Sequence, residues 1–139
     1  MRNILVPIDG SEQAWDALDY ASEEFPSATI VLLHVIDPVE AGYSTTATMA
    51  GYSEAWYEQA QERAEDLFER AEEELGDTDI ESYTEVGRPS RVIVESIEDH
   101  DVDQIVMGSH GRSGVSRILL GSVAETVVRR SPVPVTIVR

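Results

Sequence analysis

The sequence SATIVLLHVID, residues 27–37, is a nearly unbroken run of apolar residues, several of them β-branched. This composition is typical of a strand in a parallel sheet, because helices cover both faces of such a sheet and bury every side chain. Pro38 follows the run and ends it. The stretch therefore predicts a buried parallel strand, and the rest of the chain has to supply its neighbours and its covering helices.

The remaining apolar segments predict those neighbours. Short apolar or alternating runs that indicate strands cover residues 3–8, 79–86, 103–109 and 133–138. Helically spaced apolar residues lie between the strands, over residues 11–25, 53–75, 89–97 and 122–128. This alternation predicts an α/β fold: one domain over residues 1–139, with a single doubly wound, five-stranded, mostly parallel sheet and helices on both faces.

Ligands bind doubly wound sheets beyond the carboxyl ends of the strands, where the strand order reverses. Two segments are expected there, PIDGS at residues 7–11 and MGSHG at residues 107–111. Residues 38–52 are small and polar, and we expect them to form a mobile loop that closes on the ligand. His34 is expected to be an interior residue of its strand.

The chain is strongly acidic, with 27 acidic and 10 basic residues and a formal net charge of -17, and it contains no Lys. Such a surface repels nucleic acid and anionic membranes, so neither is an expected partner. Molar salt shortens the screening length from about 10 Å at 0.1 M to about 3 Å, which relieves self-repulsion. The composition favours a halophile's protein, and an ordinary acidic protein is the alternative.

Several functional classes are excluded by composition. The sequence has no Cys, which excludes disulfides and thiol catalysis. Its first apolar run is too short for a signal peptide, and no stretch approaches the roughly 20 apolar residues of a membrane span. We therefore expect a cytoplasmic location.

Glycines are concentrated in the stretch GSHGRSGVSRILLGS, residues 108–122. Gly108 and Gly111 follow a predicted strand, and Gly121 precedes a predicted helix. Free N–H groups and the positive end of the helix dipole meet at such a helix start, and together they bind phosphate. Ser122 and Glu125 also have the spacing of a capping box, which is the structural alternative.

The pattern G-x2-G-x9-G-S/T is matched by Gly108, Gly111, Gly121 and Ser122, and it resembles that of nucleotide-binding universal stress proteins. The blocks NILVPIDGS, HVID, GRPSRVIVE and SPVPVTIVR resemble the family's other conserved segments. The resemblance spans the chain except for residues 38–52. It implies a Rossmann-like nucleotide-binding fold, with ATP across the ends of the first and fourth strands, in a dimeric protein.

The resemblance also implies roles for individual residues. Asp9, preceded by Pro7 and Ile8, would accept hydrogen bonds from the ribose, and Val35 would offer backbone groups to adenine. Met107 and Gly108 would border the sugar and the base. The phosphates would be held by the amides around the residues Gly111, Gly121, Ser122 and Val123. A turn or capping role is the alternative for Asp9, and solvation or a carboxylate partner is the alternative for the two candidate phosphate contacts, His110 and Arg112.

The sequence favours a stress-response regulator or sensor over an efficient enzyme. It has no G-x4-G-K-S/T loop, and phosphoryl transfer needs a metal-holding carboxylate, a cationic clamp and a positioned base. No residue is expected to be catalytic or to bind metal, so any Mg²⁺ would be held mainly by the phosphates. The alternatives are a nucleotide-free interaction module, a slow ATPase and an adenylating enzyme.

The last predicted strand is expected to mediate homodimerisation. It would lie at the edge of the sheet, where unpaired backbone groups accept another strand. Residues Val135 to Val138 are apolar except for Thr136, and an antiparallel pair of such edges would form a symmetric dimer. Thr136→Pro is expected to remove a backbone donor from this edge and to convert the dimer to a monomer. The alternative to a dimer is that a loop of the same chain covers the edge.

Overall fold

The computed structural model of the chain describes residues 2–41, 54–110 and 120–139. Helices and strands alternate along it, as the sequence predicts. The elements are β1 (Asn3–Pro7), α1 (Glu12–Glu24), β2 (Thr29–Ile36), the 3-10 helix η1 (Pro38–Ala41), α3 (Glu54–Leu75), β3 (Asp79–Val86), α4 (Pro89–Asp99), β4 (Gln104–Gly108), α5 (Ser122–Arg130) and β5 (Val135–Val138).

The five strands form one sheet in the order β3-β2-β1-β4-β5, and each neighbouring pair is parallel. The chain moves outward from β1 through β2 to β3, and it then crosses to the other side of β1 for β4 and β5. The strand order therefore reverses between β1 and β4, which confirms the predicted doubly wound sheet. The alternating segment 79–86 is an edge strand, also as predicted.

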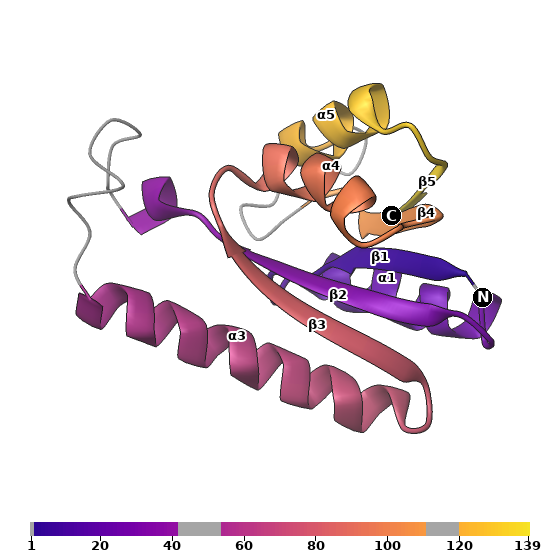
Figure 1. Ribbon diagram of the computed structural model, residues 1–139, viewed down its shortest axis with the longest axis horizontal. Helices are drawn as coiled ribbons and strands as arrows, with labels where there is room; N and C mark the ends of the chain where they lie inside the picture. Colours follow the sequence, from indigo (N-terminus) through magenta and orange to yellow (C-terminus); the bar gives the residue numbers. More distant parts are fainter. Residues whose placement is uncertain (1, 42–53, 111–119) are drawn as a thin grey trace.

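Figure 1 shows α4 and α5 above the sheet and α3 below it. Residues of α1 and α3 pack in one core, so α1 covers the same face as α3. Residues of β1 alternate between the two faces of the sheet. Ile4 and Val6 pack in the core between the sheet and α1 and α3, and Leu5 packs in the core between the sheet and α4 and α5. The inner strand β2 contributes Ile30 and Val31 to opposite cores in the same way. Burial on both faces explains why this strand is continuously apolar.

The ends of α3 and α4 follow from local backbone chemistry. Gly76 has a positive φ of 57° and ends α3, because only glycine adopts the left-handed region without a steric cost. Pro89 occupies the first turn of α4, where its missing N–H costs nothing.

The prediction of a loop over residues 38–52 is wrong at its start. Pro38–Ala41 form η1, and the Asp37 carboxylate accepts a hydrogen bond from the Val39 N–H at 3.0 Å, which supports the first turn of this helix. Residues 42–53 lie outside the part of the chain that the structure describes, as does the expected closure on a ligand.

The environment of the Asp19 carboxyl on α1 makes the stability of the fold depend on pH. Burial raises the pKa of this carboxyl above its ordinary value of 3.8, and the nearby carboxylates of Glu74, Asp16 and Glu23 raise it further. The folded protein therefore binds this proton more tightly than the unfolded chain, so the contribution of Asp19 to stability is lost as pH rises through the raised pKa.

Asp19→Asn is expected to raise the free energy of unfolding at neutral pH and low salt, because it removes a charge that the fold disfavours. Urea titrations of both proteins from pH 4 to 7 measure the effect. The advantage of Asn should grow with pH and shrink in molar KCl, and an advantage that is largest at pH 4 contradicts the assignment.

Candidate functional site

A pocket with a volume of about 790 Å³ opens at the carboxyl ends of β1, β2 and β4. This volume is in the range of ligand-binding sites, roughly 300–1,000 Å³. The first turns of α4 and α5 and one side of α3 complete its wall. The pocket thus lies at the switch point that the sequence predicts.

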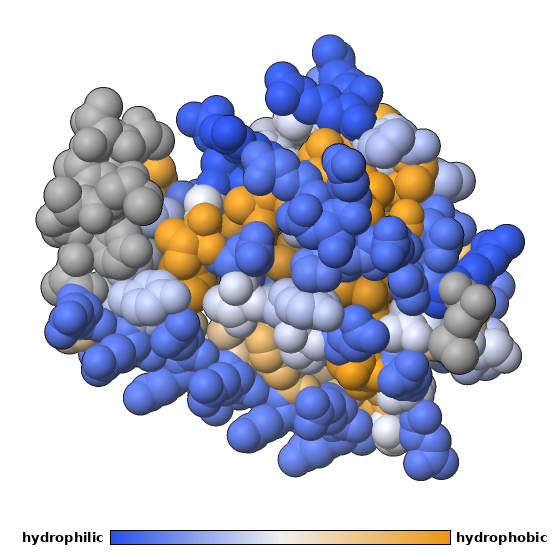
Figure 2. All heavy atoms as spheres, in the orientation of Figure 1, coloured by the Kyte–Doolittle hydropathy of each residue, from blue (hydrophilic) through white to orange (hydrophobic). Residues whose placement is uncertain are grey.

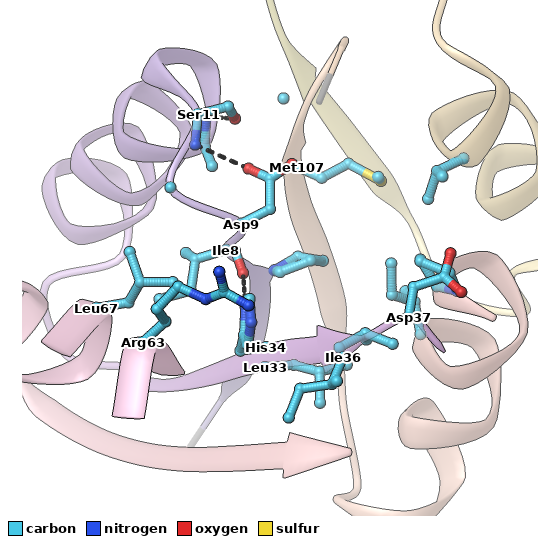
Figure 3. Close-up of a pocket in the computed structure, with 18 of the residues that line it drawn as sticks. Ile8, Asp9, Ser11, Leu33, His34, Ile36, Asp37, Arg63, Leu67 and Met107 are labelled. Carbon is cyan, nitrogen blue, oxygen red and sulfur yellow. Dashed lines mark hydrogen bonds between the residues drawn. The ribbon is translucent and has the colours of Figure 1, made fainter. Parts of the chain in front are cut away.

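Asp9 lies in the turn between β1 and α1 and lines the pocket. Its Oδ1 accepts a hydrogen bond from the Ser11 N–H at 2.9 Å, drawn as a dashed line in Figure 3. The Ser11 hydroxyl in turn accepts a hydrogen bond from the Ala14 N–H at 3.2 Å and caps α1. Asp9 therefore has the turn role considered as the alternative, and it is also placed at the pocket wall.

His34 lines the same pocket, which the expectation of a purely interior residue missed. Its Nδ1 lies 2.8 Å from the carbonyl oxygen of Ile8 (Figure 3). Because a carbonyl oxygen only accepts, Nδ1 carries the proton and donates it. This bond ties the end of β2 to the end of β1 across the pocket floor.

The loop after β4 is held from two sides. Gln13 on α1 accepts a hydrogen bond from the His110 N–H at 2.7 Å and one from the Ser109 hydroxyl at 3.2 Å, both through Oε1. On the other side, the Ser109 carbonyl oxygen accepts a hydrogen bond from the Gly121 N–H at 2.7 Å. The two segments that carry the glycine pattern are therefore bonded directly to each other.

Close packing of the backbone requires glycine at positions 108 and 121. A Cβ at Gly108 would lie 2.9 Å from the Cβ of Gln13 and 3.0 Å from its backbone carbonyl carbon. A Cβ at Gly121 would lie 2.9 Å from the Ser109 carbonyl oxygen, and Gly121 has an ordinary φ of -64°. Each glycine thus lets α1 or α5 approach the loop after β4.

The capping box considered as the alternative at Ser122 and Glu125 does not form. Gly121 is the N-cap of α5, Ser122 is its first helical residue, and no side chain caps the helix. Glu125 instead pairs with Arg129 at 3.0 Å on the exposed side of α5. The expectation that the Gly121 amide holds phosphate also needs correction, because this N–H already donates to Ser109. The amides at the start of α5 lie at the pocket wall without a side-chain cap.

Ten of the twelve site residues predicted from the sequence line this one pocket. They are Pro7, Ile8, Asp9, Val35, Met107, Gly108, His110, Gly121, Ser122 and Val123. The other two, Gly111 and Arg112, lie outside the described residues.

The contribution of α3 was not predicted. Arg63 reaches from α3 toward Ile8 and His34 in Figure 3, and it is the one Lys or Arg among the described pocket residues. The apolar stripe of α3 predicts a core-facing helix, and Ala60 and Leu67 of that stripe also line the pocket. Because Arg63 is three residues from Ala60 and four from Leu67, its helical spacing was the available signal.

Carboxylates outnumber cations on the described pocket wall, which carries Asp9, Asp37 and Asp66 beside Arg63. Among the described residues, no group of three or more His, Cys, Asp or Glu side chains is arranged to hold a metal ion. None of the described helices is long and apolar enough to cross a membrane.

The chain belongs to the universal stress protein family, whose model matches residues 1–139. The fold and the switch-point pocket agree with this assignment. It is 35% identical over 153 residues to the universal stress protein MJ0577 of Methanocaldococcus jannaschii, covering 99% of this chain and 94% of the relative.

Solved structures of the family resemble this chain over nearly its whole length. The MJ0577 structure superimposes with a TM-score of 0.85 and covers 99% of this chain and 94% of its own. UspA of Lactobacillus plantarum, 28% identical, has a TM-score of 0.83 and coverages of 99% and 97%. A universal stress protein solved in complex with cAMP, also 28% identical, has a TM-score of 0.68 and coverages of 99% and 96%.

Proposed function

We propose that this protein binds an adenine nucleotide, ATP in particular, in the switch-point pocket and acts as a stress-response regulator or sensor. The observation that carries the proposal is the meeting of the Asp9 carboxylate and the uncapped first turn of α5 in one cavity. A carboxylate suits ribose hydroxyls, and a helix start suits phosphates. The family member solved with cAMP supports the choice of an adenine nucleotide.

The pocket offers a separate place for each part of the nucleotide. The base would lie beside Val35 and Met107, which also contribute to the apolar core under α4 and α5. The ribose would face Asp9. The phosphates would lie against the amides of Ser122 and Val123 at the start of α5, with any Mg²⁺ held mainly by the phosphates.

A regulatory role fits this pocket better than efficient phosphoryl transfer. Transfer needs a carboxylate that holds the metal, a cationic clamp and a base beside the nucleophile. Asp9 and Asp37 each use one carboxylate oxygen to hold a backbone N–H, in the turns after β1 and β2. Asp9 and Asp37 are therefore each committed in part to the shape of the pocket.

Two substitutions at Asp9 separate binding from the turn. Asp9→Asn keeps an oxygen that accepts the Ser11 N–H, whereas Asp9→Ala removes it. Both should weaken ATP binding, by roughly 10- to 150-fold for the loss of hydrogen bonds to a charged acceptor, about 1.5–3 kcal/mol. Calorimetry in molar KCl measures the affinities, and thermal melts measure stability. If Asp9→Asn binds ATP as tightly as the parent protein and only Asp9→Ala binds it more weakly, Asp9 is a turn residue and does not bind the nucleotide.

We also propose that two copies pair through β5, which lies at the open edge of the sheet. The carbonyls of Pro134 and Val138 accept hydrogen bonds from the N–H groups of Ile105 and Ser109. The backbone polar groups of Pro134 and Val138 therefore point toward β4. Because the direction of the backbone N–H and C=O groups alternates from residue to residue along a strand, those of Thr136 also point toward β4. The expected effect of Thr136→Pro therefore needs correction, since this change would break pairing within one protomer.

By the same alternation, the backbone N–H and C=O groups of Val135 and Ile137 point to the open edge. Ile137→Pro should convert a dimer to a monomer in light scattering, because proline removes an outward N–H. Ile137→Ala is the matched control, since it loses apolar packing but keeps the donor. A parent protein that is monomeric, or equal dissociation of both variants, contradicts pairing through this edge.

A further inference from the structure

Three polar groups form a chain that ends in the pocket. The Gln13 Oε1 lies 3.2 Å from the Ser109 Oγ, and that Oγ lies 3.0 Å from the Nδ1 of His110. The same Gln13 oxygen accepts the backbone N–H of His110 at 2.7 Å. Residues from α1 and from the end of β4 thus hold one imidazole by its backbone and by its ring.

The direction of these hydrogen bonds is determined by Gln13. Its Oε1 must face the loop, because only an oxygen accepts the His110 N–H. The Ser109 hydroxyl therefore donates its one proton to Oε1, since two oxygens 3.2 Å apart with no proton between them would repel. The Ser109 oxygen then accepts, so the Nδ1 of His110 donates to it. Neutral His110 consequently carries its proton on Nδ1.

This tautomer leaves a lone pair on the Nε2 of His110. The residue is only 6% exposed, and Nε2 is buried with no hydrogen-bond partner among the described residues. His110 lines the proposed nucleotide pocket, and a Cβ built on Gly121 would lie 3.4 Å from the His110 Cα. The unsatisfied acceptor thus belongs to a pocket residue that directly follows Ser109, whose carbonyl oxygen accepts the Gly121 N–H at the start of α5, where the phosphates are proposed to bind.

We infer that Gln13 is a positioning residue that fixes the tautomer of His110 and thereby couples nucleotide binding to the uptake of one proton. This inference rests on the proposed function. Neutral Nε2 presents a lone pair that repels phosphate oxygens. When Nε2 takes a proton from solvent, it donates a charge-assisted hydrogen bond to the phosphate and the imidazolium offsets its charge.

The charges around the pocket favour that proton. These charges come from four parts of the wall: the turn after β1, the end of β2, the segment after β2, and α3. The described ionisable residues are Asp9, His34, Asp37, Arg63 and Asp66. With three carboxylates and one guanidinium, they leave a bound phosphate short of positive charge, which the imidazolium formed on binding supplies.

Proton uptake is measured by titrating ATP into the protein at one pH, in buffers with different ionisation enthalpies. The dependence of the observed heat on the buffer gives the protons bound. The parent protein should take up as much as about one proton more than His110→Asn, which supplies the baseline due to ATP itself. Its affinity should also fall as pH rises, by up to about tenfold per unit, with a shallower slope in His110→Asn.

Gln13→Met tests whether the hydrogen bond from Gln13, rather than the packing of its side chain, fixes the tautomer of His110. It keeps the length of the side chain but removes the acceptor, so the Ser109 hydroxyl can donate to Nδ1 and move the proton to Nε2. Neutral His110 then donates to phosphate directly, and the extra proton uptake should disappear while ATP still binds.

The outcomes distinguish this inference from the proposed function. ATP binding by the parent protein with no more proton uptake than His110→Asn overturns the inference and leaves nucleotide binding intact. Undiminished uptake in Gln13→Met also overturns the role of Gln13. An absence of ATP binding in the parent protein overturns the proposed function itself.

Discussion

Gly121→Ala is expected to weaken ATP binding on the order of 100-fold, although it adds a single methyl group. That Cβ would lie 2.9 Å from the Ser109 carbonyl oxygen, so α5 and the loop after β4 have to move apart. Moving them breaks the 2.7 Å hydrogen bond between the Gly121 N–H and Ser109. It also displaces the α5 amides and His110 from a common phosphate, and two lost charge-assisted bonds cost about 3 kcal/mol or more.

Gly76→Ala is the matched control for this prediction. Gly76 has a φ of 57°, so alanine strains the backbone there by roughly 1–2 kcal/mol, yet its Cβ meets no atom within 4 Å. This variant should lose stability and keep its affinity for ATP in calorimetry. If both variants bind ATP as tightly as the parent protein, the phosphates do not lie at the start of α5.

Transfer from molar to low KCl is expected to lower the melting temperature by roughly 10 °C, equivalent to about 3 kcal/mol for a chain of this size. The net charge of -17 is carried by one small domain. Like charges repel over about 10 Å at 0.1 M salt and over only about 3 Å at 1 M. Hydrophilic side chains lie along α3 in Figure 2, and half of the 22 residues of this helix are Glu, Asp or Arg.

Ion pairs do little to offset this repulsion in the described part of the chain. The three pairs found there, Arg70–Glu74, Arg91–Glu95 and Arg129–Glu125, are exposed pairs four residues apart on helices. Pairs of this kind contribute about 0.3–0.5 kcal/mol each, so screening them costs little. Added salt should therefore stabilise the fold.

The salt effect is distinguished from general solute exclusion by a neutral control. Sucrose stabilises folded proteins without screening charge, so thermal melts in sucrose give the non-electrostatic part. The proposed halophilic character requires a much larger effect of KCl. A melting temperature that is unchanged between 0.1 M and molar KCl contradicts it.

The sequence predicts the fold because this fold depends on local patterns. Continuous apolar runs identify the inner strand β2, and alternation identifies the edge strand β3, since burial on one or two faces leaves different patterns. The position of the pocket follows from topology, because strand order alone locates the switch point. Asp9 and Ser122 were found in this way, each directly beyond a strand or at a helix start.

Contacts between distant segments could not be predicted from the sequence. Gln13 and His110 are 97 positions apart, and nothing local indicates that they share a hydrogen bond. The role of Gly121 depends on the same packing, because its neighbour is the backbone of Ser109. Arg63 was missed because its helical spacing from Ala60 and Leu67 indicates only that the three share one side of α3. The placement of that side over the pocket depends on tertiary packing.

The most direct test of nucleotide binding is to identify what the protein carries. Protein purified in molar KCl is denatured, and the small molecules released are separated by chromatography and identified by mass. We predict a near-stoichiometric amount of an adenine nucleotide from the parent protein and little from Gly121→Ala. Release of no nucleotide, combined with no heat of binding when ATP is titrated into the same preparation, would contradict the proposed function.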